Sequence, residues 1–73
     1  MPELPHLSGA EAVKTFQKMG FAVARQRGSH VVLRNGASGC VIPLHKDLAQ
    51  GTLRSAIKQA GVTAEAFIAA FHR

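Results

Sequence analysis

Residues 21–44 read F-A-V-A-R-Q-R-G-S-H-V-V-L-R-N-G-A-S-G-C-V-I-P-L, and this stretch decides the fold. Three short runs within it have the alternation and the β-branched side chains of strands, and they span residues 21–26, 30–34 and 40–44. Arg27-Gly28 and Asn35-Gly36 are turn signals that separate these runs. The stretch therefore predicts three antiparallel strands joined by hairpins.

The second connection and the third strand carry further signals. Asn35-Gly36 is a strong signal for a short hairpin, although A-S-G at residues 37–39 suggests a longer loop. Proline has no backbone N–H, so Pro43 implies that the third strand is short there or lies at an edge of the sheet.

A helix is predicted before the strands. Ser8 to Glu11 form a capping box, in which the hydroxyl and the carboxylate each satisfy a free backbone N–H. An apolar stripe at helical spacing follows, and Gly20 has the position of a left-handed residue that ends a helix. We therefore expect a helix over residues 9–19, preceded by an extended segment, residues 1–7, that holds two prolines.

Two helices are predicted after the strands. The second helix begins at Gly51-Thr52 and ends at Gly61, and Thr63 is the N-cap of a short third helix. An antiparallel sheet can be covered by helices on one face and exposed to solvent on the other. Residues 1–73 are therefore expected to form one two-layer α+β domain, with a three-stranded antiparallel sheet and its helices on one face.

Strand alternation assigns each side chain of the second strand to a face. Arg34 must face water, so His30 and Val32 share its face, while Val31 and Leu33 point to the core under the helices. His30 is therefore expected to be exposed, unless a bulge reverses the alternation.

The charge distribution favours a polyanionic partner. The chain of 73 residues carries a net charge of +5, and the interval from Ala12 to Lys46 holds six basic residues and no acidic one. Such an interval attracts nucleic acid or an acidic protein, although it is also compatible with a solvated basic surface. The four aromatic residues are all Phe, and three of them fit helix core positions, which argues against a base-stacking platform.

Composition also bounds the compartment. A single cysteine, Cys40, allows no internal disulfide and fits a reducing, cytoplasmic setting. No apolar run approaches the ~20 residues of a membrane span, and the first residues are too lightly charged for a signal peptide.

Residues 25–34, R-Q-R-G-S-H-V-V-L-R, contain the candidate site. Imidazole moves protons near neutral pH, and guanidinium groups hold phosphate. His30 among Arg25, Arg27 and Arg34 therefore indicates chemistry on a phosphodiester or its binding. The alternative is a basic hairpin whose histidine merely faces water.

Three motifs resemble the HicA toxins of bacterial type II toxin–antitoxin pairs. They are G-S-H at residues 28–30, V-I-P-L-H at residues 41–45 and G-T-L-R-S-A-I-K-Q-A-G-V-T at residues 51–63. The resemblance begins at the capped first helix and covers nearly all of the chain. Two loops depart from the family pattern. The loop at residues 46–50 is short, and the loop at residues 35–39 differs from the more usual aspartate–glycine turn. Both differences could alter RNA preference.

The resemblance implies a fold, an activity and a partner. The fold would be similar to that of the double-stranded-RNA-binding domain, and the activity that of an mRNA interferase of bacteria or archaea with His30 as the catalytic residue. Gly28 matches the glycine that makes the turn. A HicB-type antitoxin would cover the active face, and DNA would be reached only through that antitoxin.

The chemistry can also be considered without the family. RNA carries its own nucleophile, the 2′-hydroxyl, so an enzyme needs a base, a phosphate clamp and an acid for the leaving 5′-oxygen. His30 is the candidate base, and His45 is a possible second proton-transfer residue. The candidate RNA-binding residues are Arg25, Arg27, Gly28, Ser29, Arg34 and Lys46. No metal or other cofactor is required, and the histidines and Cys40 lack the spacing of a zinc site.

Two other function classes remain open. A non-catalytic RNA-binding module of double-stranded-RNA-binding type would have the same topology, but it would need a dense lysine cluster at the start of the second main helix. That place holds G-T-L-R, residues 51–54. A small scaffolding protein would leave the arginines around His30 unexplained.

Overall fold

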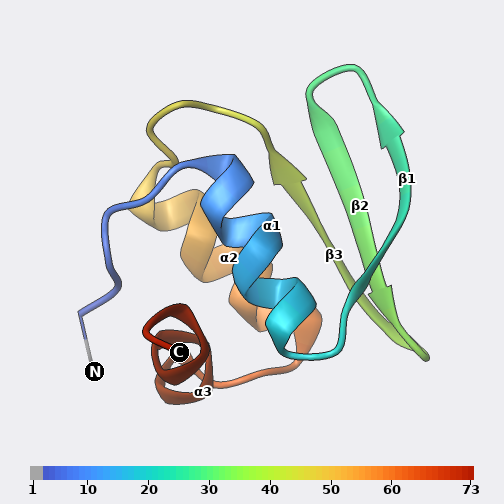
Figure 1. Ribbon diagram of the computed structural model, residues 1–73. Coiled ribbons are helices and arrows are strands. Elements are labelled where there is room, and N and C mark those ends of the chain that lie inside the picture. Colours follow the sequence, from blue (N-terminus) through green and yellow to red (C-terminus); the bar gives the residue numbers. More distant parts are fainter. Residues whose placement is uncertain (1–2) are drawn as a thin grey trace.

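The computed structural model describes residues 3–73, which form three helices and three strands (Figure 1). In chain order these elements are α1 (Gly9–Lys18), β1 (Ala22–Arg27), β2 (His30–Asn35), β3 (Ser38–Pro43), α2 (Gln50–Ala60) and α3 (Ala64–Phe71). The predicted order of elements is confirmed, with boundaries shifted by one or two residues. Residues 3–7 have no regular secondary structure, and the extension expected of residues 1–2 lies outside the described residues.

Both ends of α1 are stabilised as the sequence predicts. The Ser8 N–H donates to Glu11 Oε1 at 2.9 Å and the Glu11 N–H donates to Ser8 Oγ at 3.1 Å, which completes the capping box. After Gly20, the Phe21 N–H donates to the Phe16 carbonyl at 3.0 Å. The rings of Phe16 and Phe21 meet edge to face with centroids 5.4 Å apart, so the end of the helix also directs the chain into β1.

The strands pair in the order β1-β2-β3, and both pairs are antiparallel. Pro43 therefore lies on an edge strand, as predicted. The short hairpin indicated by Asn35-Gly36 is confirmed, and the longer loop suggested by residues 37–39 is wrong, because Asn35 already pairs with Ser38 across a connection of two residues. Gly36 makes this possible with a φ of 62°, a left-handed value that the first position of such a turn requires.

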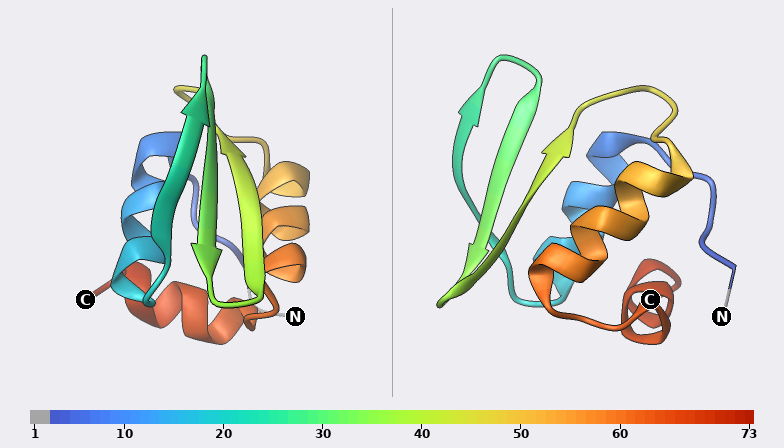
Figure 2. Two further views of the ribbon diagram at one scale, coloured as in Figure 1. Left: turned by 90° about the vertical axis from the view of Figure 1, so that its right-hand side faces the viewer. Right: turned by 180° about the vertical axis from the view of Figure 1, so that it is seen from behind.

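The helices cover one face of the sheet, which confirms the predicted α+β architecture. In the left view of Figure 2 the three strands lie in front, with α1 behind one side and α2 behind the other. Val31, Leu33 and Ile42 point to the helices and are buried. The helix α3 packs on α1 and α2 rather than on the sheet, and its Phe67 ring lies 5.1 Å from that of Phe16.

The hairpin of β1 and β2 extends beyond the helices (Figures 1 and 2). All six residues of β1 are exposed, although β1 pairs with β2 along its length. β1 therefore contributes little to the core and presents its side chains to solvent, whereas β2 contributes the buried Val31 and Leu33. Within residues 3–73, no helix is long and apolar enough to span a bilayer.

Candidate functional site

His30 is the first residue of β2 and follows a turn of only two residues, Gly28 and Ser29. Gly28 has a φ of 56°, which matches the first central position of the tight turn that joins twisted strands. Because the loop has two residues, Arg27 is paired directly with His30. His30 is exposed, which confirms the orientation predicted from strand alternation.

The cross-strand register gathers the predicted site residues on the face that the helices leave bare. Residues paired directly opposite one another share a face, so this face can be read as three rows across the sheet. We call it the uncovered face, and its rows are Arg27–His30–Pro43, Arg25–Val32–Val41 and Ala22–Arg34–Gly39; Pro43, at the end of the first row, is buried. None of these nine residues is acidic, and all three arginines are exposed.

A β-bulge at Ala24 allows the arginines of β1 to face outward while Phe21, just before the strand, is buried. The turn at Gly28 and Ser29 sets Arg25 and Arg27 on the uncovered face, whereas Phe21 has to be buried at the other end of the strand. The register shifts between Val23 and Arg25, so Ala24 is the extra residue. The bulge lies in β1, and the alternation within β2 that orients His30 is undisturbed.

Arg34 lies across the neighbouring strand. A Cβ added at Gly39 would come 2.9 Å from Arg34 Cδ and 2.8 Å from the Leu33 carbonyl oxygen, so only glycine leaves room for this side chain. From the sequence alone, Gly39 belongs to the loop suggested at residues 37–39. Its role becomes visible only once it is paired with Arg34.

His45 and Lys46 follow β3 at the same end of the sheet as His30. The Leu44 N–H donates to the Ser29 carbonyl at 2.6 Å, which continues the ladder beyond the pair of His30 and Pro43. The Gly9 N–H donates to the His45 carbonyl at 2.8 Å and anchors the chain there. His45 and Lys46 are both exposed. All the sequence-predicted site residues therefore lie on the uncovered face, in the turn beside it or in the loop after β3.

Val41 was missed by the sequence reasoning. It pairs with Val32 in the middle row of the uncovered face, and 41% of its surface is exposed. Alternation along β3 could have found it, because Val41 lies between Cys40 and Ile42, which are both buried.

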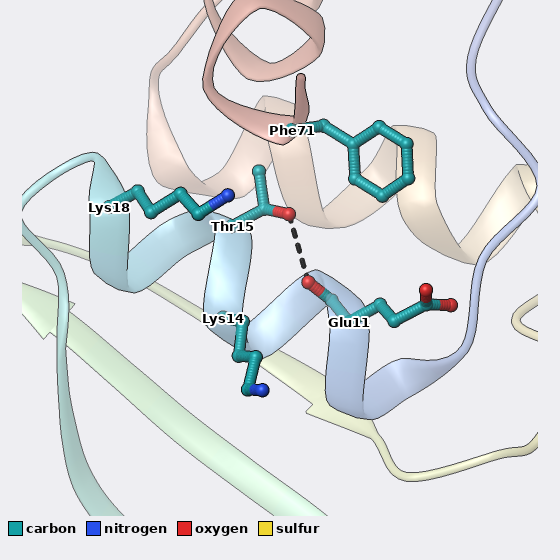
Figure 3. A pocket seen from close by; sticks show the side chains of 5 residues that line it. All are labelled: Glu11, Lys14, Thr15, Lys18 and Phe71. Atoms are coloured by element: carbon teal, nitrogen blue, oxygen red, sulfur yellow. Dashed lines mark hydrogen bonds between the residues drawn. The ribbon is translucent and has the colours of Figure 1, made fainter. Parts of the chain in front are cut away.

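A second group of basic side chains lies on the helical side of the molecule. An open pocket of about 330 Å³ lies there, and it is lined by Glu11, Lys14, Thr15, Lys18 and Phe71 (Figure 3). The Lys18 ammonium donates to the carbonyls of Ala70 at 3.4 Å and Arg73 at 2.9 Å, so Lys18 links α1 to α3. Lys14 points away from Phe71 in this view.

Cys40 belongs to the core and not to the site. It is paired with Leu33 on the covered face, and burial raises the pKa of its thiol to about 11. A thiol in this state is a poor nucleophile. Among residues 3–73, no three His, Cys, Asp or Glu side chains gather in an arrangement that could hold a metal ion.

The sequence profile described as HicA toxin of bacterial toxin-antitoxin matches residues 9–62 of the 73. The chain belongs to the HicA toxin family. The matched range runs from the start of α1 to the residue after Gly61, so it includes the whole sheet and the uncovered face. HicA toxins act in toxin–antitoxin systems, which pair a toxin with an antitoxin. No match was found among curated proteins or among solved structures.

Proposed function

We propose that this HicA-family toxin is an mRNA interferase, an endoribonuclease that cleaves mRNA with His30 as its catalytic residue and so inhibits translation and growth. The observation that carries the proposal is the pairing of Arg27 with His30 on the uncovered face, which sets a proton acceptor beside a phosphate-binding group. A module that only bound RNA would need the arginines but not the histidine.

The proposed reaction uses the nucleophile that RNA contains. His30 accepts the proton of a 2′-hydroxyl, the 2′-oxygen attacks the adjacent phosphorus, and the bond from phosphorus to the 5′-oxygen breaks. The guanidinium groups of Arg27 and Arg25 stabilise the charge that develops on the phosphate. His45 is the candidate that protonates the leaving oxygen, because it lies two residues after the pairing partner of His30. The products are a 2′,3′-cyclic phosphate and a free 5′-hydroxyl.

Growth after induced expression tests the proposal. The parent chain is expected to arrest growth and to cut mRNA, and His30→Ala is expected to do neither. His6→Ala is the matched control, since His6 is also exposed but lies in the segment before α1. Equal toxicity of the parent and His30→Ala would contradict the catalytic assignment.

The mechanism also predicts cleavage in the presence of EDTA. The four carboxylates, Glu3, Glu11, Asp47 and Glu65, lie on different segments of the chain, so they offer no shared site for magnesium. Product ends that carry a cyclic phosphate support the use of the 2′-hydroxyl. Activity that is lost in EDTA and restored by magnesium would refute this route.

We further propose that a HicB-type antitoxin inhibits the toxin by covering the uncovered face. Three exposed arginines and an exposed Val41 offer a basic surface with an apolar centre, which an acidic partner would complement. Amide hydrogen exchange with and without the antitoxin is the test. Protection at residues 28–34 supports this mode of inhibition, whereas protection confined to residues 62–73 in a complex that still cleaves RNA would rule it out.

A further inference from the structure

The uncovered face has an apolar centre. Val32 and Val41 are paired directly opposite one another in its middle row, where Val32 is half-buried and Val41 is 41% exposed. The exposed part of Val41 has no packing role in the domain itself. We call this pair the valine patch.

Groups that can interact with phosphate surround the valine patch on three sides. Arg25 is the third member of its own row, His30 lies in the row before it on β2, and Arg34 lies in the row after it, across Gly39. Neighbouring rows are two residues apart along a strand, which corresponds to about 6.7 Å. This interval is comparable with the separation of successive phosphates in an extended RNA strand.

An apolar patch flanked by two arginines and an imidazole matches the chemistry of a nucleotide. Each repeat of a nucleic acid strand presents one charged phosphate and one base with a flat apolar face. In a duplex the base faces are covered by stacking, so only an unpaired nucleotide can offer one to a protein surface. A duplex could contact the arginines through its phosphates and would leave the two valines without a partner.

We propose that the valine patch seats one unpaired base of a single-stranded RNA, next to the phosphodiester that is held at His30. This inference rests on the proposed function, since it places the seat relative to the cleaved bond. The seat selects single-stranded RNA over duplex RNA, and the arginines hold the phosphates on either side of the seated base.

The test measures binding in the His30→Ala background, so that the RNA stays intact. The probes are a short fluorescent RNA strand of mixed sequence, an abasic strand of the same length and a duplex of the first strand. The variant is Val41→Ala, and the matched control is Val23→Ala. Val23 is 43% exposed, like Val41, but it pairs with the buried Leu33 and so lies on the other side of the sheet.

Val41→Ala is expected to weaken binding of the intact single strand about three- to tenfold and to leave binding of the abasic strand unchanged. Val23→Ala is expected to change neither, and both variants should unfold at the temperature of the parent. Equal binding of the intact and abasic strands, or no effect of Val41→Ala, would overturn the inference.

A parallel cleavage assay with His30 present separates this inference from the proposed function. If the protein binds RNA in a base-dependent way but cleaves none, the valine patch is supported as a base-binding site and the catalytic role of His30 is refuted. Cleavage by a protein whose binding ignores both Val41→Ala and the loss of bases would refute the seat and support the catalytic role.

Discussion

The two faces of β2, a strand of six residues, differ in role: one carries candidate site residues and the other carries core residues. On one face His30 and Arg34 are exposed, and on the other Val31 and Leu33 are buried under the helices. Successive side chains of a strand point to opposite faces, so a substitution in β2 changes either the site face or the core face and not both. In a domain this small, one strand therefore contributes both to the core and to the candidate site. Function and stability should therefore respond to different residues of β2.

The largest expected effect is on the exposed face. His30→Ala should lower the rate of RNA cleavage by about 10²- to 10⁴-fold, the usual contribution of a positioned acid or base. Its melting temperature should stay within about 4 °C of the parent, because an exposed side chain leaves no cavity. Single-turnover cleavage and thermal unfolding measure the two quantities. A variant that is unfolded would show that His30 has a structural role instead.

Leu33→Ala should have the opposite profile. Leu33 is fully buried, so its truncation should cost about 2–5 kcal/mol of unfolding free energy, measured in urea. Arg34→Ala is the matched control on the next residue, and it should change this free energy by less than about 0.5 kcal/mol. Similar losses for both variants would mean that the two faces do not divide stability from function.

Arginine substitutions should change the salt dependence of RNA binding. Arg27→Ala and Arg34→Ala are each expected to reduce the slope of log affinity against log salt by about one, since each removes one phosphate contact. Arg54→Ala is the control, because Arg54 is exposed on α2 and away from the uncovered face. A reduced slope for Arg54→Ala alone would locate the RNA on the helices.

The smallest expected effect concerns the buried face at alkaline pH. The pKa of Cys40 is raised from 9.0 to about 11 in the folded protein, so between these values the folded state retains a proton that the unfolded state has lost. Unfolding therefore becomes easier as the pH rises, by about 1 kcal/mol at pH 10. Urea unfolding between pH 8 and pH 10 measures this loss, and Cys40→Ala should remove it. An identical pH dependence in Cys40→Ala would assign the loss to other groups.

Local signals predicted the elements with small errors. The capping box at Ser8 and Glu11, the end of α1 at Gly20 and the cap of α3 at Thr63 all occur as predicted. Each depends on a hydrogen bond between residues at most five apart, so the sequence contains all the information that is needed. The exposure of His30 was equally accessible, since it follows from the alternation within one strand.

Features that depend on pairing were missed or predicted incorrectly. The longer loop suggested by residues 37–39 does not form: Ala37 completes a two-residue turn that begins at Gly36, and Ser38 and Gly39 are paired with β2. The bulge at Ala24 reconciles the β1–β2 turn with the burial of Phe21, two constraints at opposite ends of the strand. Neither outcome can be read from one segment alone.

The amino-acid sequence alone was enough to predict the order of helices and strands, the net positive charge and the face to which His30 belongs. These properties follow from composition and from periods of two or 3.6 residues, which act within a single element. Only the tertiary structure decided that Arg27 faces His30, that Arg34 lies over Gly39 and that Val32 meets Val41. Such contacts depend on cross-strand register, which turn length, bulges and burial of the core determine together.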